Sequence, residues 1–296
     1  MNIKTVLVVG GGTMGQMIAM LCAENGYTVH IYDVAETALA DARKRIARWL
    51  AKKTTAGKLT PEKEQAVLQA ISYYTDPAKA AENVDLISES VPEDPELKGK
   101  VLSTFHPLCR PETIFTTNTS TLLPSQFADA TGRPEKLCAL HFHDTRTTNI
   151  VDVMPHPKSA PEVLKAVTEF ARSMGQVPIV LEKEFGGYVL NNMLMSFINA
   201  ALTMAQQEVT RIEEIDKSWM GVMHTVVGPF GIMDSIGLDT VYKIISYQAE
   251  KEDDRQAKAN AVYLKALMDQ GKMGMKSGRG FYTYPNPAFL SPEFLK

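Results

Sequence analysis

The chain has 296 residues, of which 45% are apolar and 22% are charged. This length fits one large domain or two ordinary ones, long enough to bury a substantial core. The net charge of −3 argues against a nucleic-acid partner. Three widely spaced cysteines exclude a disulfide framework and a thiolate metal site. Because no apolar run approaches the roughly 18 residues of a membrane span, we expect a cytoplasmic globular protein that binds neither membrane nor metal.

Six short runs rich in apolar residues predict strands in the first two-thirds of the chain. The runs are nearly continuous rather than alternating, which is typical of a parallel sheet covered on both faces. Helical patterns separate them, including a long helical insert that ends near Gly57. Repeated strand–helix units predict a doubly wound α/β (Rossmann) domain. The expected strands are Val6–Val9, Val29–Tyr32, Val84–Val91, Thr113–Asn118, Leu137–Phe142 and Pro178–Leu181.

No convincing strand follows Leu181, and the remaining sequence has helical patterns. One long apolar helix is expected from 187 to 208, and others over about 240–251 and 256–270. Thr210 and Glu213 have the spacing of a capping box at the start of the next helix. We therefore expect an all-α C-terminal domain at 183–296, after a Rossmann domain at 1–182.

A glycine-rich turn, residues 10–15, follows the first expected strand and opens a helix. Gly10 permits the tight turn, Gly12 lets the backbone approach a pyrophosphate, and Gly15 allows close packing of helix and strand. Thr13 and Met14 lie at the helix N-terminus, where unpaired N–H groups bind phosphate. Together these five residues predict a dinucleotide site.

Asp33 ends the second expected strand. A carboxylate at this position can bind the adenosine ribose hydroxyls and repel a 2′-phosphate. The sequence therefore predicts NAD rather than NADP as the cofactor.

Among the six histidines, His141 stands out because it lies at the carboxyl end of an expected strand. In an open α/β sheet, ligands bind beyond those strand ends. Asp152 follows after a short connection, and a carboxylate on one ring nitrogen would leave the other nitrogen free to act as a base. Asp144 is an alternative partner. It lies only three residues after His141 on a turn, so its side chain is less well placed than that of Asp152 to face the His141 ring.

Several short motifs along nearly the whole chain resemble, in order, the L-3-hydroxyacyl-CoA dehydrogenase family. The resemblance implies a Rossmann domain, a helical dimerising domain, NAD as cofactor and a short-chain L-3-hydroxyacyl-CoA as substrate. Several matches in order are more specific than any one of them. The motifs are Val91-Pro92-Glu93 with Lys98, residues 118–122, His141-Phe142, residues 187–191, residues 227–230 with Asp234, Gly237-Leu238-Asp239, and residues 277–282.

The resemblance also implies roles for single residues. His141 would remove the 3-hydroxyl proton. Asp152 would orient His141, at the position where the family usually has Glu. Ser120 would hydrogen-bond the substrate oxygen, and Asn191 would help to place the acyl group. Positions near the cofactor are matched by Asn118, Glu93 and Lys98.

The chain departs from the family's pattern directly after His141. The family typically continues with Phe-Asn-Pro and places its Glu twelve residues after the histidine, whereas Asp152 is eleven residues on. A one-residue deletion in the loop accommodates this if 150–153 forms the usual strand. The altered loop, His143–Thr148, leaves the substrate's identity open.

A basic segment without acids runs from residue 43 to 58. Lys44, Arg48 and Lys52 share a helix face by their four-residue spacing. These residues, with Lys53, are predicted to bind the phosphates of CoA. The resemblance places the helical insert beside the CoA. The other interpretation is a basic helix face that is only solvated.

Two alternatives to a CoA thioester dehydrogenase remain open at this point. Arg146, in the loop after His141, could clamp a free carboxylate. The resemblance also implies non-CoA substrates as an alternative, because some relatives of the family act on hydroxy acids such as gulonate or carnitine, or on diketo esters. The other is a nucleotide-binding protein without turnover, against which the set of Ser120, His141, Asp152 and Asn191 argues.

Overall fold

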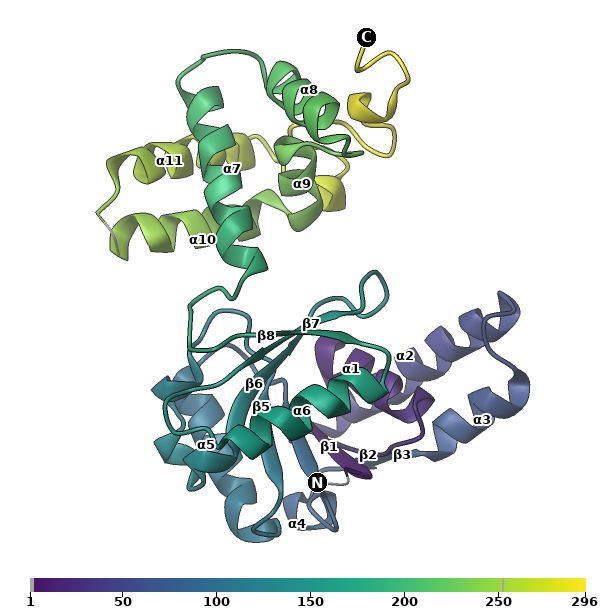
Figure 1. Ribbon diagram of the computed structural model, residues 1–296. Coiled ribbons are helices and arrows are strands. Elements are labelled where there is room, and N and C mark those ends of the chain that lie inside the picture. The colour runs from purple at the N-terminus through teal and green to yellow at the C-terminus, as the bar shows by residue number, and fades with distance from the viewer. Residues whose placement is uncertain (1–2, 252) are drawn as a thin grey trace. The chain divides into compact units, whose positions relative to one another are not determined.

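The computed structural model describes residues 3–251 and 253–296. The chain divides into two compact units, Met1–Tyr188 and Val189–Lys296 (Figure 1). In the part that the structure describes, no helix has the length and apolar character needed to cross a membrane. The expected order of a Rossmann domain followed by an all-α domain is confirmed.

The first unit is built on one eight-stranded sheet with the order β3-β2-β1-β4-β5-β6-β7-β8. β6 and β7 pair antiparallel, and every other neighbouring pair is parallel. The strands are β1 (Thr5–Val9), β2 (Thr28–Tyr32), β3 (Ile71–Tyr74), β4 (Leu86–Glu89), β5 (Ile114–Thr117), β6 (Leu137–Phe142), β7 (Ile150–Met154) and β8 (Val177–Val180).

The six expected strands are present within two residues of their expected bounds. β3 was not expected, because its four residues, Ile-Ser-Tyr-Tyr, form a short and only partly buried edge strand. The sheet is not parallel throughout, because β7, which contains the strand implied by the resemblance at 150–153, turns back beside β6 after a short loop. That reversal is what brings residue 152 opposite residue 141.

Helices cover both faces of the sheet. α1, α2, α3 and α6 pack on one face, and α4 and α5 on the other. Figure 1 shows α1 and α6 lying along the same face. The helices are α1 (Thr13–Glu24), α2 (Glu36–Thr55), α3 (Pro61–Gln69), α4 (Pro77–Ala80), α5 (Pro95–Phe105) and α6 (Pro161–Ser173), with 3₁₀ turns at His106–Leu108, Pro124–Gln126, Asp129–Thr131 and Pro134–Lys136.

The second unit is helical throughout its regular structure. Its elements are α7 (Leu190–Gln206), α8 (Ile212–Met223), α9 (Pro229–Ile236), α10 (Leu238–Lys251) and α11 (Arg255–Asp269), with 3₁₀ turns at Met275–Ser277 and Ala288–Leu290. The expected capping box is wrong: Arg211 is the N-cap of α8, and no side chain caps it within the described residues.

The boundary between the units lies six residues beyond the expected one. α7 begins at Leu190 rather than at 187, because Gly187 and Tyr188 have positive φ angles of 79° and 52°, outside the helical region. Residues 181–188 pack with the first unit, where the Phe185 N–H contacts the Met154 sulfur at 3.2 Å.

Two buried aspartates hold the core of the second unit. Asp216 accepts hydrogen bonds from the N–H groups of Phe230 and Gly231 at the start of α9 and from the Tyr282 hydroxyl. Asp234 accepts from the N–H groups of residues 281 and 282 and from the Tyr284 hydroxyl. A Cβ at Gly280 would lie 1.9 Å from Asp234 Oδ1, so these family motifs preserve packing around the two carboxylates.

Burial raises the pKa of Asp216 from an ordinary value near 3.8 to about 6, although the hydrogen bonds to its carboxylate oppose the shift. The folded state therefore binds this proton more tightly than the unfolded chain, and the resulting stabilisation is lost as the pH rises through 6. Asp216→Asn should reduce the pH dependence of the unfolding free energy between about pH 4 and pH 6 by up to about 3 kcal/mol. Denaturant titrations across this range measure the difference, and identical slopes in the two proteins would contradict the assignment.

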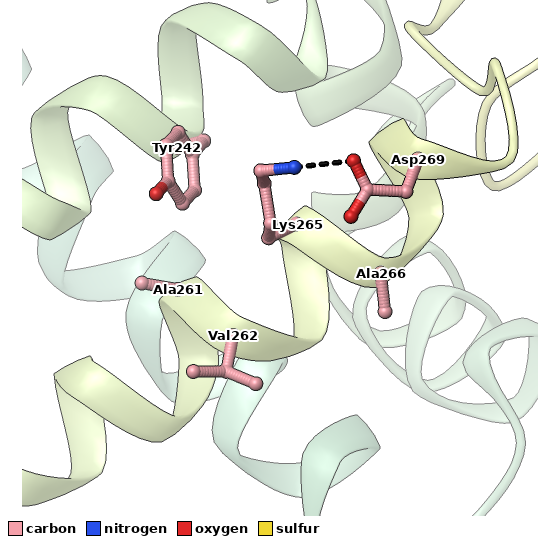
Figure 2. Close-up of a pocket in the computed structure, with 6 residues that line it drawn as sticks. All are labelled: Tyr242, Ala261, Val262, Lys265, Ala266 and Asp269. Atoms are coloured by element: carbon pink, nitrogen blue, oxygen red, sulfur yellow. Dashed lines mark hydrogen bonds and ion pairs between the residues drawn. The ribbon is translucent and has the colours of Figure 1, made fainter.

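A pocket of about 270 Å³ lies on the second unit between α10 and α11 (Figure 2). Tyr242 contributes one wall from α10, and the α11 residues Lys265 and Asp269 form an ion pair at another. Ala261, Val262 and Ala266 complete the lining. None of the residues predicted to act in binding or catalysis lines this pocket.

Candidate active site

The glycine turn between β1 and α1 has the geometry that the sequence predicts. Gly10 has a φ of 109°, and a Cβ there would lie 2.6 Å from the Ser90 carbonyl oxygen. A Cβ at Gly15 would lie 1.9 Å from the Gly10 carbonyl oxygen, so only glycine allows this approach. At Gly12, by contrast, a Cβ would meet no atom within 4 Å.

The open space at Gly12 lies beside the N-terminus of α1. No side chain in the described residues caps this terminus, and its first turn carries no acid. Thr13 is exposed and Met14 half-buried at the same end. A backbone with free N–H groups and an open approach fits a pyrophosphate group.

Asp33 links the end of β2 to the glycine turn. Its Oδ2 accepts the Gly11 N–H at 2.8 Å, and its Oδ1 accepts the Ala35 N–H at 3.0 Å. The half-buried carboxylate is therefore fixed next to the turn, where it fits the hydroxyls of an adenosine ribose. The ribose contact itself stays a prediction.

The two glycines provide a matched pair of variants. Gly15→Ala should destabilise the fold by at least about 2 kcal/mol, because the added methyl overlaps backbone. Gly12→Ala should cost about 1 kcal/mol of stability or less, because Gly12 is the N-cap of α1 and alanine caps a helix less well than glycine. It should weaken NAD binding at least about tenfold, a loss of about 1.4 kcal/mol. Thermal unfolding and NAD titration separate the two effects. Unchanged NAD affinity in Gly12→Ala would show that no phosphate approaches this residue.

His141 and Asp152 lie opposite each other in the antiparallel β6–β7 pair. His141 Nδ1 is 3.0 Å from Asp152 Oδ2, and both side chains are buried. The ionised carboxylate accepts the Nδ1–H, which leaves Nε2 as the free acceptor of the ring. Asp144, the alternative partner, instead pairs with Arg146.

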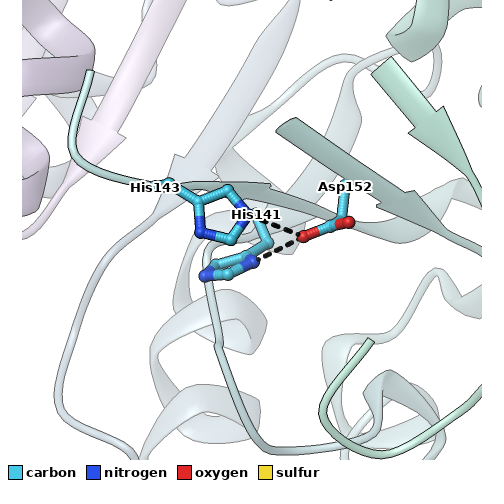
Figure 3. A group of neighbouring side chains, drawn as sticks. All are labelled: His141, His143 and Asp152. Atoms are coloured by element: carbon cyan, nitrogen blue, oxygen red, sulfur yellow. Dashed lines mark hydrogen bonds and ion pairs between the residues drawn. The ribbon is translucent and has the colours of Figure 1, made fainter. Parts of the chain in front are cut away.

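A second histidine, which the sequence analysis did not select, joins this pair (Figure 3). His143 Nε2 is 3.1 Å from the same Asp152 oxygen, and the two imidazole rings meet edge to face with centroids 4.5 Å apart. Alternation along an extended chain could have revealed it, since residues two apart share a face.

Tyr188 is another functional candidate that sequence reasoning missed. Its ring stacks on His141, with centroids 4.8 Å apart and an interplanar angle of 22°. Its hydroxyl donates to the Thr119 carbonyl oxygen at 2.6 Å. Burial and the charge of Asp152 raise the pKa of Tyr188, so the hydroxyl stays protonated and keeps its bond to Thr119, which holds the ring against His141.

Ser120 is held at the end of β5 by Glu93. Glu93 Oε1 accepts the Ser120 N–H at 2.7 Å and is 3.2 Å from its hydroxyl, and it also accepts the Thr119 hydroxyl. The Lys98 ammonium lies 3.4 Å from Glu93 and 2.8 Å from buried Glu89. Lys98 is only 1% exposed, which indicates a supporting role; its direct cofactor contact stays a prediction.

The charges around the site follow from these contacts. Burial alone would raise the pKa of Asp152, but hydrogen bonds from His141 and His143 and their positive charge hold it below its usual range. Burial would also raise the pKa of Glu93, but the Lys98 charge and several hydrogen bonds lower it below its usual range. Burial raises the pKa of Glu89 despite its contact with Lys98.

Comparison with known proteins agrees with this arrangement. The 3-hydroxyacyl-CoA dehydrogenase NAD-binding domain profile matches residues 5–185, and the C-terminal domain profile of the same family matches 187–284. This chain belongs to the 3-hydroxyacyl-CoA dehydrogenase family. It is therefore an NAD-dependent oxidoreductase.

Relatives in this dehydrogenase family resemble the chain over almost its whole length. A probable 3-hydroxybutyryl-CoA dehydrogenase of Bacillus subtilis is 31% identical, covering 96% of this chain and 98% of the relative. The human mitochondrial hydroxyacyl-coenzyme A dehydrogenase is 30% identical, and the match covers 95% of this chain and 91% of the relative. A solved diketoreductase, described as performing substrate-directed dual catalysis of dicarbonyl compounds, is 38% identical with a TM-score of 0.88, covering 96% of this chain and all of that one.

Two residues predicted from the family lie in different units. The Asn118 side-chain oxygen accepts the Phe142 N–H at 2.7 Å, which ties the end of β5 to the end of β6 beside His141. Asn191 lies in the first turn of α7 in the second unit. The cofactor contact of Asn118 and the substrate contact of Asn191 stay predictions.

The predicted substrate-binding cations differ in their surroundings. Lys44, Arg48 and Lys52 are exposed on α2. Lys53 instead pairs with Glu24 at 2.5 Å, so it is not a free cation as expected. Arg146 makes a two-pronged contact with Asp144 and lies 5.8 Å from the Trp49 ring centroid. A substrate carboxylate would have to displace Asp144, which argues against the expected clamp.

Proposed function

We propose that this dehydrogenase interconverts a short-chain L-3-hydroxyacyl-CoA and the corresponding 3-oxoacyl-CoA. The observation that carries the proposal is the His141–Asp152 pair near the carboxyl end of β6. The glycine turn that fits NAD follows the carboxyl end of β1, on the same side of the sheet. Family membership is also the basis for expecting a homodimer, and the composition of the chain is the basis for expecting a cytoplasmic protein. The chemistry argued below requires neither.

The proton step is assigned to His141. When bound, NAD supplies the chemistry of hydride transfer. During oxidation His141 accepts the 3-hydroxyl proton at Nε2, and during reduction it returns that proton to the oxygen formed at C3. Asp152 holds the tautomer in which Nε2 is free and stabilises the imidazolium. Tyr188 restrains the ring through its stacking contact.

We assign Ser120 the hydrogen bond to the substrate oxygen. Glu93 fixes the position of this serine. A hydroxyl at this point can accept from the substrate alcohol or donate to the carbonyl. Asn191 is assigned to placing the acyl group, as the family pattern implies. These contacts orient the reacting carbon, which lowers the entropic part of the barrier.

A second candidate function has its own support. The loop at 143–149 departs from the family's usual sequence, and the 38% identical diketoreductase is described as acting on dicarbonyl compounds. The same proton chemistry on a free 3-oxo acid or a diketo ester is therefore the alternative. NADH consumption with acetoacetyl-CoA, compared with free 3-oxo acids and diketo esters, distinguishes the two. Turnover of the non-CoA compounds alone would replace the first proposal.

His141→Ala should lower kcat roughly 10²- to 10⁴-fold, because that is the contribution of general acid–base catalysis. NAD affinity should be retained, since the glycine turn is untouched. Steady-state kinetics on the best substrate of the panel, with NAD titration as the folding control, measures both. A kcat within a factor of two of the wild type would remove His141 from the proton step.

Neutralising Lys44, Arg48 and Lys52 together to Gln should raise the KM for a CoA thioester roughly threefold or more, since exposed ion pairs contribute about 0.2–1 kcal/mol each. A control variant with Lys100, Lys165 and Lys183 changed to Gln carries the same charge change on other exposed parts of the first unit. Equal KM values in the two triple variants would leave the basic face of α2 without a role in CoA binding.

A further inference from the structure

Three side-chain atoms of the kinds that bind metal ions lie close together near the end of β6. The proposed proton step uses His141 and Asp152 but not the third residue, His143. His141 Nδ1 and His143 Nε2 lie 3.0 Å and 3.1 Å from Asp152 Oδ2, and all three atoms lie within 4.8 Å of one another. In Figure 3 both rings turn a nitrogen toward the same carboxylate oxygen. His143 has no part in moving the substrate proton.

The chemistry of this set suits a transition-metal ion. Imidazole nitrogen and carboxylate oxygen are zinc ligands, with bond lengths of about 2.0–2.2 Å, and two such ligands in a tetrahedral site lie about 3.4 Å apart. The observed nitrogen–oxygen separations are shorter than this by a few tenths of an ångström, so small side-chain rotations would admit an ion.

The surroundings provide both rigidity and access. β6 and β7 fix His141 and Asp152 as register partners. His143 precedes a turn in which the Thr147 and Thr148 N–H groups donate to the Asp144 carbonyl oxygen, so the segment that follows it is ordered by hydrogen bonds. The His143 side chain is 17% exposed, compared with 7% for His141 and 2% for Asp152, so an ion would enter from the His143 side.

We propose that His141, His143 and Asp152 form a binding site for one divalent transition-metal ion, represented here by Zn²⁺, and that this ion inhibits the dehydrogenase. Binding of the ion at His141 Nδ1 and His143 Nε2 displaces the proton from each of these nitrogens to the other nitrogen of the same neutral ring, so no proton is gained or lost overall. The remaining Nε2 of His141 then carries a proton and cannot accept one from the substrate. Metal binding and proton transfer are therefore mutually exclusive at this imidazole.

Equilibrium dialysis of the full chain against ZnCl₂, followed by metal analysis, tests the site without substrate or turnover. The wild type should bind one Zn²⁺ per chain. His143→Gln should weaken this binding at least about tenfold, since even outer-shell partners of a metal ligand cost 10–100-fold. The visible absorption of bound Co²⁺ should appear in the wild type and be lost in the variant.

His224→Asn is the matched control, because it removes an exposed histidine from a left-handed position that asparagine tolerates. This control should bind Zn²⁺ as the wild type does. Absence of saturable binding in the wild type, or equal affinity in wild type and His143→Gln, would overturn the site.

Inhibition rests on the proposed function and is measured separately. Zn²⁺ should abolish NADH-linked turnover of the wild type, EDTA should restore it, and His143→Gln should need at least about tenfold more Zn²⁺ for the same fractional loss. A wild type that binds one Zn²⁺ at this site but keeps full turnover would overturn the inhibitory role. If no substrate of the panel is turned over, the proposed function fails while the dialysis result still decides the site.

Discussion

The antiparallel pairing of β6 with β7 is the constraint on which the site depends. In a wholly parallel sheet, residues eleven apart in sequence could not face each other across neighbouring strands, because a parallel connection needs a long crossover. The short return loop makes His141 and Asp152 direct register partners. Every other feature of the proton chemistry, including the tautomer and the position of Nε2, follows from this pairing.

A charge network anchored on two buried residues, Lys98 and Glu89, supports the position of Ser120. Lys98 joins Glu89 at the end of β4 to Glu93 in the following loop, and Glu93 holds the Ser120 backbone. Removing one member of such a network would leave another charge buried without a partner, which costs several kcal/mol. The position of the serine hydroxyl therefore depends on residues that need not touch substrate.

Much of the fold could be predicted from the sequence because its signals are local. Continuous apolar runs identified six strands, and the spacing of Gly10, Gly12 and Gly15 identified the cofactor turn. β3 lacked this signal because it is a short, partly buried edge strand. The direction of β7 is a property of tertiary pairing, which no local pattern encodes.

Only part of the candidate site could be predicted from the sequence. The contact between His141 and Asp152 could be expected from a strand end and a nearby acid, whereas His143 and Tyr188 needed the folded arrangement. Tyr188 approaches His141 from a segment 47 positions later in the chain, through a backbone with positive φ. The ion pairs of Lys53 and Arg146 were also invisible, because sequence shows where a cation is but not which acid neutralises it.

The contact between Asp144 and Arg146 has a consequence for substrate selection. Arg146 is the only Lys or Arg in the loop at 143–149, and its charge is already balanced within the loop. The exposed cations Lys44, Arg48 and Lys52 on α2, by contrast, have positive charge available for an anion. A molecule with phosphates on a long arm gains from such a distribution, whereas a compact acid, whose charge sits near its reacting carbon, gains little from it.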